Sequence, residues 1–433
     1  MPFPEDLDRD QLRALQTERL RHLVGNVLGG NAFWRGHLGE AGLSDLDALS
    51  DRLQDLARLS DLPVCSKQDL VSDQDAEQPY GSNLSEPLSA YTRLHQTSGT
   101  TGRPLRWLDT PSAWSNLLEA WAQIFRIAGV VPADRFAFPF SFGPFIGFWA
   151  AFEGAAEAGH LCLPGGGMSS AARLQLIEDN QATVVCCTPT YALRLAEVAA
   201  GEGADLSRGS VRMLIVAGEP GGSVPGIRDA IESAWGARVI DHWGMTELGP
   251  LAVECESEPG GMHMLETECI AEVVDPEQLQ PVAAGEQGEL LITTLRRSGS
   301  PVLRYRTGDL VVVDPEPCGC GRALLRLRGG ILGRADDMIT VRGNNVFPSS
   351  IEAVIRGVDG VAEFRVLLGS DGAMDRLSVE IEPMEGAAEG AVADGVAAAI
   401  RGTFNFGADV TAVAAGTLPR FELKGRRFVR DSA

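Results

Sequence analysis

Residues 97–104 combine hydroxyl side chains, glycines and one cation in a short run, Thr-Ser-Gly-Thr-Thr-Gly-Arg-Pro. Glycines let a backbone approach a phosphate closely, and hydroxyl and amide groups donate hydrogen bonds to its oxygens. The Walker pattern is absent, because Arg103 and Pro104 follow the second glycine. We therefore predict a phosphate-binding loop of another kind, and a simple flexible turn is the alternative. The predicted contact residues are Ser98, Gly99, Thr100, Thr101, Gly102 and Arg103.

Five further stretches of this kind follow along the chain. Ala-Gly-Glu-Pro at 217–220 comes directly after an apolar run, where open α/β sheets bind ligands. Asp-His-Trp-Gly-Met-Thr-Glu at 241–247 offers a carboxylate for Mg²⁺, a hydroxyl for phosphate and a ring to stack on a base. Arg-Tyr-Arg-Thr-Gly-Asp at 304–309 offers two cations and an acid for ribose hydroxyls. The last two are residues 333–337 with 342–348, and residues 423–427 around Lys424. Each is weak alone, but six in this order indicate a nucleotide site.

The composition bounds the classes of protein to which the chain can belong. A length of 433 residues predicts two or three domains, and the 44% hydrophobic content is that of a globular protein. A net charge of −22 argues against nucleic acid and anionic membranes as partners. We see no 18-residue apolar run and no signal peptide, so we expect a cytoplasmic protein without a membrane span. Only Lys67 and Lys424 are lysines among 37 basic residues.

The helices and strands that must position these stretches predict an α/β protein. Helical spacing marks residues 5–60, and apolar runs at 183–187 and 213–217 predict buried strands. We expect helices over 112–128, 170–180 and 224–235, and further strands over 270–274, 289–294 and 310–313. After residue 338 the chain restarts as a small α+β unit with helices near 349–357 and 390–401 and strands near 363–368 and 377–382, followed by a loop and a tail. We predict a large N-terminal multi-subdomain domain over 1–333 and a small C-terminal domain over 334–433.

In these six stretches the sequence resembles the adenylate-forming superfamily of acyl-CoA synthetases, adenylation domains and luciferases. Within it, the nearest likeness is to the phenylacetate–CoA ligase family, over about residues 60–430. The marks of that family are the short chain, Gly-Asn-Asn-Val-Phe-Pro at 343–348 before Ile351 and Glu352, and Leu-Pro-Arg at 418–420 ahead of the lysine. The resemblance implies a mobile C-terminal domain and two half-reactions. A carboxylate attacks the α-phosphorus of ATP to give an acyl-adenylate and pyrophosphate, and a thiol, usually that of coenzyme A, then displaces AMP.

The resemblance also implies roles residue by residue. The loop at 97–104 grips the β- and γ-phosphates, Glu219 and Pro220 lie against adenine, and Trp243 stacks on it. Thr246 contacts the α-phosphate, Glu247 holds Mg²⁺, and Lys424 bridges the attacking carboxylate and the α-phosphate, where a point cation offsets the repulsion of two anions. Asp309 binds the ribose hydroxyls, and Asp336 is the hinge. The other expected nucleotide-binding residues are Gly218, Asp241, Arg334 and Gly343.

An aromatic segment at 138–149 is the expected acyl pocket. It concentrates Phe and Trp in a chain that is only 6% aromatic, and aromatic walls suit a flat aryl acid. The alternative is the start of a core helix. The sequence leaves open whether the acid is an anthranilate, a hydroxybenzoate or phenylacetate. The expected substrate contacts are Phe140, Phe142, Gly143, Phe145, Gly244 and Met245.

Cys255, His263, Cys318 and Cys320 are a candidate zinc site, since three thiolates and one imidazole make a closed tetrahedral set. Several members of the resembling family carry Cys and His at these places. The alternative is three buried thiols and a surface histidine.

Three functions stay open at this stage. The first is an AMP-forming aryl-acid–CoA ligase that acts on a small aromatic acid with ATP, Mg²⁺ and coenzyme A, and we expect it to be a homodimer. The second is a stand-alone adenylating enzyme that loads a carrier-protein thiol or an amine. The third is a non-catalytic nucleotide-binding protein, which the presence of Glu247 and Lys424 disfavours.

Overall fold

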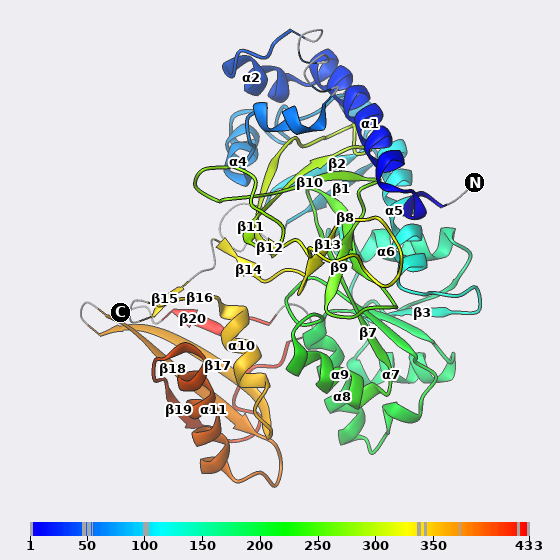
Figure 1. Cartoon of the computed structure of the whole chain (residues 1–433). Helices are drawn as coiled ribbons and strands as arrows, with labels where there is room; N and C mark the ends of the chain where they lie inside the picture. Colours follow the sequence, from blue (N-terminus) through cyan, green and yellow to red (C-terminus); the bar gives the residue numbers. More distant parts are fainter. Residues whose placement is uncertain are drawn as a thin grey trace.

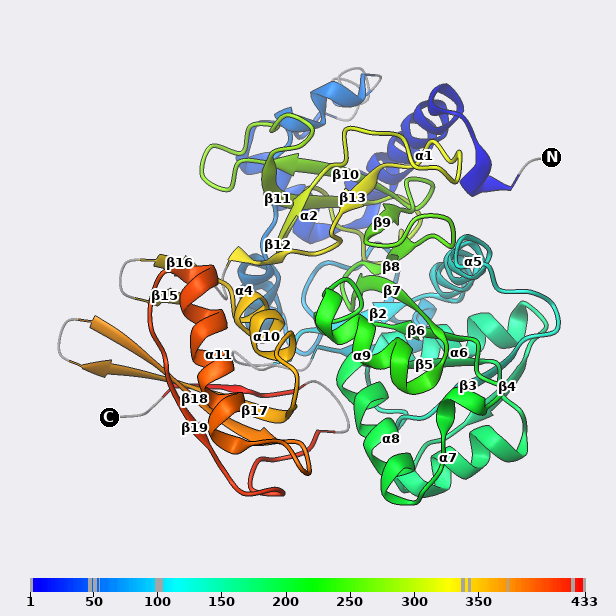
Figure 2. The same ribbon diagram turned by 60° about the horizontal axis from the view of Figure 1, so that its bottom comes forward.

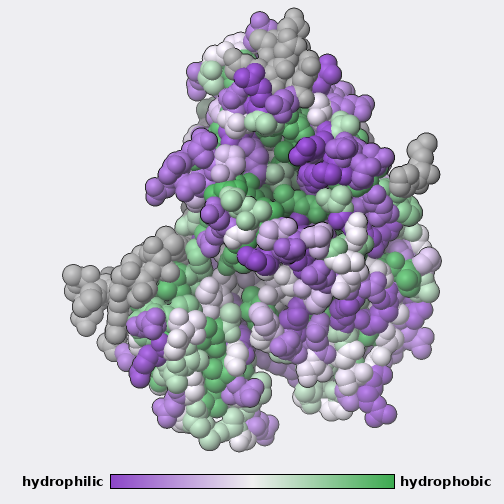
Figure 3. All heavy atoms as spheres, viewed as in Figure 1, coloured by the Kyte–Doolittle hydropathy of each residue, from purple (hydrophilic) through white to green (hydrophobic). Residues whose placement is uncertain are grey.

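A computed structural model describes residues 3–45, 49, 53, 55–97, 104–335, 339–341, 344–371, 374–421 and 425–430. The chain forms a larger N-terminal part and a smaller C-terminal lobe, which is drawn in orange and red (Figure 1). In the space-filling view, this lobe stands out at the lower left of the molecule (Figure 3). Among the described helices, none combines the length and the apolar character needed to cross a bilayer.

The N-terminal segment is helical, as its sequence spacing predicts. Asp8 caps α1 through a reciprocal capping box with Gln11, and the apolar stripe of Leu12, Leu20 and Leu23 is fully buried. The helices of this segment are η1 (Pro4–Asp6), α1 (Arg9–Gly30), α2 (Ala32–Glu40), η2 (Leu56–Asp61), α4 (Lys67–Ala76) and η3 (Leu88–Ala90).

An eight-stranded sheet forms the middle of the larger part, in the order β13-β9-β8-β7-β6-β5-β3-β4. The run from β4 to β7 is parallel, and β7, β8, β9 and β13 are antiparallel. Its strands are β3 (Arg135–Phe138), β4 (Leu161–Pro164), β5 (Val184–Cys187), β6 (Met213–Val216), β7 (Arg238–Met245), β8 (Gly249–Glu254), β9 (Gly261–Met264) and β13 (Arg326–Arg328).

Helices cover both faces of this sheet, because its parallel strands are apolar on both sides. In β5, Val184 and Cys186 join the core cluster under α5 and α6, whereas Val185 and Cys187 join the cluster under α7, α8 and α9. Figure 2 shows α7, α8 and α9 together on one side of the sheet. The helices are α5 (Pro111–Ile127), α6 (Ile146–Glu157), α7 (Ser170–Asp179), α8 (Pro189–Gly201), η4 (Leu206–Arg208) and α9 (Pro225–Trp235).

Two smaller sheets complete the larger part. The hairpin of β1 (Arg93–Gln96) and β2 (Arg106–Asp109) brackets residues 97–105. A four-stranded antiparallel sheet has the order β10-β11-β12-β14 and packs with the N-terminal helices in one core cluster. Its strands are β10 (Cys269–Val274), β11 (Gln287–Thr294), β12 (Tyr305–Val312) and β14 (Gly333–Arg334). Because β14 still pairs with β12, the domain boundary at 333/334 stays a prediction.

The C-terminal lobe is α+β, as predicted, and it contains strands that the sequence analysis does not predict. The hairpin of β15 and β16 precedes the first predicted helix. The predicted loop and tail contribute two strands, β19 (Asp409–Ala412) and β20 (Phe428–Arg430), which pair in parallel with β18 and β17. At four and three residues, each strand is too short to show an alternation of apolar and polar positions. The other elements are β15 (Ile339–Val341), β16 (Asn344–Val346), α10 (Pro348–Arg356), β17 (Val361–Asp371), β18 (Met374–Pro383) and α11 (Glu389–Phe404).

The predicted helices and strands are confirmed within a few residues at each end, including 170–180 as Ser170–Asp179 and 349–357 as Pro348–Arg356. The lobe meets the larger part along α9 and α10, which lie side by side (Figures 1 and 2). A side chain at Gly226 of α9 would place its Cβ 3.2 Å from the backbone nitrogen of Gly357, at the end of α10. The two helices therefore pack almost backbone to backbone there.

Candidate functional site

The turn after β6 and the start of the motif at 241–247 lie together, at the carboxyl ends of two parallel strands. Gly218 has a φ of +94°, which allows the chain to turn sharply out of the sheet. A Cβ at Gly222 would lie 2.4 Å from the carboxyl carbon of Asp241. The sheet thus brings residues 218–222 against Asp241, in the position where parallel α/β sheets bind ligands.

Asp241 and His242 lie below this turn and are both buried. Ser223 donates a hydrogen bond from Oγ to Oδ2 of Asp241 at 2.6 Å, but burial raises the pKa of Asp241 to about 7. Burial lowers the pKa of His242 to about 4, with its Nδ1 2.7 Å from the carbonyl of Ala252. The imidazole of His242 is therefore neutral at pH 7, whereas the carboxyl of Asp241 titrates near neutral pH. The role of Asp241 in nucleotide binding stays a prediction.

Trp243 and Asp309, the expected adenine and ribose contacts, touch each other. Nε1 of Trp243 donates to Oδ2 of Asp309 at 2.9 Å, and Nη1 of Arg334 lies 3.4 Å from Oδ1. The two residues are 66 positions apart, and no local sequence pattern predicts the hydrogen bond between them. A stacking ring beside a carboxylate is an arrangement suited to a nucleoside.

Glu247, the expected Mg²⁺ ligand, is buried beside two polar groups. Oη of Tyr305 donates to Oε1 of Glu247 at 3.3 Å, and Nζ of Lys67 lies 3.9 Å from the same oxygen. Burial and the nearby carboxylate raise the pKa of Tyr305, so it stays a donor. No sequence motif assigns a role to Lys67, although it is one of only two lysines in an arginine-rich chain.

Thr246, the expected α-phosphate contact, is tied to the β1–β2 hairpin by a buried ion pair. Arg297 donates from Nε and Nη2 to both carboxylate oxygens of Asp109, at 2.7 and 2.6 Å, and from Nη1 to the carbonyl of Thr246 at 2.5 Å. Both charged side chains are at most 2% exposed. Arg297 thus connects the strand that follows the phosphate loop to the backbone of Thr246, and no sequence motif marked it.

The aromatic segment lies between β3 and α6 and reaches the same hairpin. The backbone nitrogen of Gln96 donates to the carbonyl of Pro144 at 2.7 Å, directly before the phosphate loop. Phe142 is half-buried, with its ring centroid 5.0 Å from that of Trp149. Phe140 is 4% exposed and packs against Phe138 in the core, which favours the core-helix alternative for that residue.

The other predicted substrate contacts have less to support them in the structure. Phe145 is half-buried beside Gly143, and Gly244 and Met245 close β7 against β8. Their contact with an acid stays a prediction.

Several predicted site residues lie outside the described residues. These are the whole phosphate loop (Ser98, Gly99, Thr100, Thr101, Gly102 and Arg103), Asp336, Gly343 and Lys424. Their roles stay predictions.

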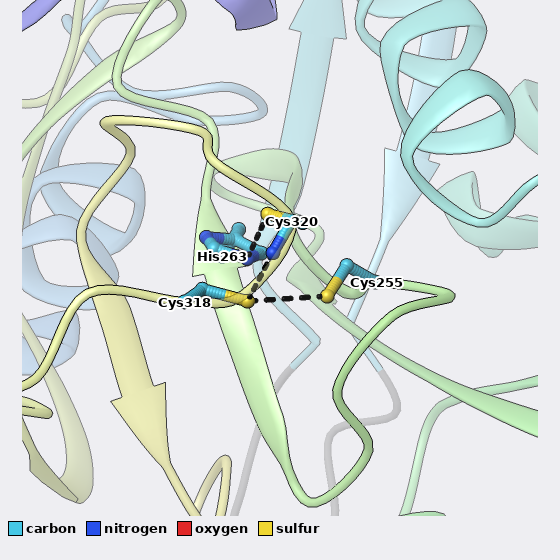
Figure 4. A group of neighbouring side chains, drawn as sticks. All are labelled: Cys255, His263, Cys318 and Cys320. Carbon is cyan, nitrogen blue, oxygen red and sulfur yellow. Dashed lines mark hydrogen bonds between the residues drawn. The ribbon is translucent and has the colours of Figure 1, made fainter.

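The four candidate zinc ligands come together in space (Figure 4). Cys255 follows β8, His263 lies in β9, and Cys318 and Cys320 lie in the loop before β13. Their ligand atoms are all within 4.8 Å of one another. The Sγ atoms of Cys255 and Cys318 are 3.5 Å apart, and Sγ of Cys320 is 3.4 Å from Nε2 of His263.

This donor set fits a tetrahedral zinc ion. Four ligands at zinc's usual bond lengths stand about 3.3–3.8 Å from one another, close to these separations. Nδ1 of His263 lies 3.4 Å from the carbonyl of Leu324, which leaves Nε2 to face the sulfurs, as in sites where the second nitrogen orients the ring. Burial lowers the pKa of His263 to about 4, so the ring is neutral and able to bind a metal.

The sequence matches the family of AMP-binding enzymes over residues 50–295, and the C-terminal domain of AMP-binding enzymes over residues 343–431. The chain therefore belongs to the family of AMP-binding enzymes. It is 34% identical to the phenylacetate–coenzyme A ligase of Thermus thermophilus, over 89% of this chain and 84% of that one. It is 32% identical to the phenylacetate–coenzyme A ligase of Escherichia coli, over 96% of this chain and 94% of that one. The chain is an AMP-forming acid–thiol ligase of the phenylacetate–CoA ligase kind.

Solved structures of 2-hydroxyisobutyryl-CoA ligase match the fold over 99% of this chain and 91% of theirs, at 30–31% identity. The TM-score is 0.92 for that enzyme in its postadenylation state with an acyl-AMP, and 0.74 for its thioesterification state with coenzyme A. The two parts of this chain are thus arranged as in the postadenylation state.

Proposed function

We propose that this enzyme activates an aryl carboxylic acid with ATP and transfers the acyl group to coenzyme A. In the first step a carboxylate oxygen bonds to the α-phosphorus and the bond to the β-phosphate oxygen breaks, which gives acyl-AMP and pyrophosphate. In the second step the coenzyme A thiol loses its proton and attacks the acyl carbon, and AMP leaves. The similarity of the chain to two phenylacetate–coenzyme A ligases supports both steps.

The observation that carries the aryl acid is the aromatic segment beside the phosphate loop. Phe142 and Trp149 form an edge-to-face pair, and the bond from Gln96 to Pro144 ties their segment to the end of β1. A flat ring can stack against half-buried aromatic side chains there, close to where its carboxylate must meet the α-phosphate.

We assign a separate role to each residue of the nucleotide site. The ring of Trp243 stacks on adenine, Asp309 accepts hydrogen bonds from the ribose hydroxyls, and the hydroxyl of Thr246 donates to the α-phosphate. Lys424 supplies a point cation between the acid and the α-phosphate. Glu247 would hold Mg²⁺, which neutralises phosphate charge when bound.

We assign the zinc ion a structural role. Cys255, His263, Cys318 and Cys320 fill all four tetrahedral positions with protein atoms, so no position is left for a substrate. The ion would fasten the loop before β13 to β8 and β9, and we expect it to contribute to folding free energy rather than to the chemistry.

A panel of acids in ATP–pyrophosphate exchange tests the substrate class. We expect phenylacetate, hydroxybenzoates or anthranilate to support exchange, followed by thioester formation with coenzyme A alone. Faster exchange with 2-hydroxyisobutyrate or a medium-chain aliphatic acid than with every aryl acid would contradict the aryl proposal. Exchange without thioester formation would favour a carrier-protein or amine acceptor instead.

The Lys424→Ala variant tests the role of the lysine. Loss of one preorganised electrostatic donor costs about 10²–10³ in rate, so exchange should nearly vanish. Thioester formation from supplied acyl-adenylate should survive much better. An equal loss in both half-reactions would exclude this role.

A further inference from the structure

Lys67 is the first residue of α4, and hydrogen bonds fix the backbone just before it to β12. The backbone nitrogen of Cys65 donates to the carbonyl of Arg304 at 3.2 Å, and the backbone nitrogen of Arg306 donates to the carbonyl of Cys65 at 2.8 Å. A capping box at Ser66 then fixes the start of the helix. The lysine therefore leaves the chain at a defined place beside β12, the strand that carries the expected ribose contact.

The face of α4 that carries Lys67 also contacts the β1–β2 hairpin. Gln74 lies seven positions after Lys67 and therefore on the same face of the helix. Its side chain donates from Nε2 to the carbonyl of Arg106 at 2.6 Å, and its Oε1 accepts from the backbone nitrogen of Arg106 at 3.0 Å. Arg106 begins β2, directly after residues 97–105. This face of α4 is therefore bound to the strand that follows the expected phosphate-binding loop.

The ammonium of Lys67 lies near the buried carboxylate of Glu247 but remains accessible. Nζ is 3.9 Å from Oε1 of Glu247, beyond the reach of about 3.2 Å of a direct N–H···O hydrogen bond. The side chain of Lys67 is 42% exposed, whereas that of Glu247 is 2% exposed. Since an ammonium has three donors, Lys67 can serve a further anion at this place.

The arginines around the site are already bound to carboxylates, whereas Lys67 makes no direct hydrogen bond to a described residue. The chain has a net charge of −22, so a polyphosphate can bind only where local cations offset the repulsion. The ion pairs that engage the arginines are Arg297 with Asp109, Arg304 with Glu272, Arg306 with Glu289, and Arg334 with Asp309.

We propose that Lys67 is a phosphate-binding residue of the adenylation half-reaction. Its ammonium donates to the β- and γ-phosphate oxygens of ATP and to the pyrophosphate that leaves. The inference rests on the proposed function, in which Glu247 holds Mg²⁺ and the loop between β1 and β2 binds the same phosphates. Lys67 joins these two places, because its ammonium faces Glu247 and its helix is bound to β2. A compact cation with three donors suits phosphate oxygens as a point charge.

The test compares Lys67→Met and Lys67→Arg with the control Arg58→Met. Methionine removes the charge from an unbranched side chain, and arginine keeps the charge. Arg58 is a cation of the same N-terminal segment whose side chain is 59% exposed. Lys67→Met should raise the KM for ATP and for pyrophosphate in exchange about tenfold, the lower end for a hydrogen bond to a charged group, because the side chain is partly exposed. Lys67→Arg should recover most of this loss, and Arg58→Met should stay within about twofold.

Direct binding separates a phosphate contact from a general disturbance of the site. In calorimetric titrations with Mg²⁺ present, Lys67→Met should bind ATP about tenfold more weakly than the wild type, but it should bind AMP within about twofold of the wild type. AMP lacks the two phosphates that Lys67 contacts. Thioester formation from supplied acyl-adenylate involves no pyrophosphate, so it should also stay within about twofold.

Three results would overturn the assignment. An equal weakening of ATP and AMP would mean that Lys67 stabilises the site as a whole. An unchanged KM for ATP and pyrophosphate would exclude the contact, and a lower Mg²⁺ requirement in the same variant would leave Lys67 as the counter-ion of Glu247. A defect in Lys67→Arg as large as that in Lys67→Met would mean that the charge is not what matters.

Failure of the proposed function would look different. If the wild type exchanged pyrophosphate with none of the acids, the proposed function would fall, while the titrations with ATP and AMP would still decide whether Lys67 binds the β- and γ-phosphates.

Discussion

Replacing Arg297 with methionine should destabilise the larger part of the chain and slow adenylation together. The substitution removes three hydrogen bonds, two to Asp109 and one to the carbonyl of Thr246. It leaves the carboxylate of Asp109, which is 0% exposed, without its bidentate partner. Breaking a buried pair by removing one member costs about 3–5 kcal/mol, because the remaining charge loses its main partner and is not hydrated. Nδ1 of His95, 3.8 Å from Oδ2, is then the nearest group that can stabilise the carboxylate.

This loss is large enough to measure by thermal unfolding. In a cooperative unit of about 300 residues, an unfolding entropy near 2 cal/mol/K per residue makes 1 kcal/mol worth about 1.6 °C. The first unfolding transition of Arg297→Met should therefore fall by about 5–8 °C at pH 7.5. A matched control is Arg58→Met, because the pair of Arg58 and Asp61 has side chains 59% and 40% exposed, and we expect it to cost less than about 1 kcal/mol.

The destabilisation should also depend on pH in a defined direction. Although burial alone would raise it, the pKa of Asp109 lies below its ordinary value, because Arg297 and His95 stabilise the carboxylate. In the wild type this stability is present above the unfolded pKa and is lost as the pH falls through the folded pKa. In Arg297→Met the carboxyl should titrate at a raised pKa, so the variant recovers part of its deficit between pH 7 and pH 5. A deficit below about 1 kcal/mol, or one that does not shrink on acidification, would refute the reasoning.

Three further outcomes are expected. Cys318→Ser should lower the zinc content from about one ion per chain by elemental analysis and lower the unfolding temperature, without changing acid preference; a zinc-free wild type with full thermal stability would contradict the site. In the wild type, the buried imidazole of His242 has a pKa of about 4, whereas the unfolded chain takes up the proton near pH 6.5, so the folded state loses up to about 3 kcal/mol between pH 6.5 and 4. His242→Asn should not show this part of the loss. Parallel curves of stability against pH for the two proteins would contradict this prediction. Phe142→Ala should raise the KM for an aryl acid, because the lost ring contact contributes about 0.5–1.5 kcal/mol of binding free energy, and it should leave the KM for ATP nearly unchanged. If the variant lost the binding of both ATP and the acid, Phe142 would be a core residue.

Local sequence patterns predict several of the helices and strands of this protein and the chemistry of its motifs. Apolar runs such as Val184–Cys187 predict buried strands because both faces of a parallel sheet must be covered. The order of the six stretches along the chain predicts the family. The side-chain chemistry of Cys255, His263, Cys318 and Cys320 predicts a set of metal ligands.

The complete fold is needed to see which distant residues are joined by hydrogen bonds and ion pairs. Arg297 and Asp109 are 188 positions apart, and Glu219 and Gly425 are 206 apart, so no local periodicity could have paired them. The strands β19 and β20 likewise depend on the edges that β18 and β17 offer in the lobe, because segments of four and three residues are too short for an apolar pattern to predict them. Local pattern depends on which face of an element is apolar. Pairing between distant residues depends on how the packed elements bring backbone donors and buried charges within hydrogen-bonding reach, which only the complete fold specifies.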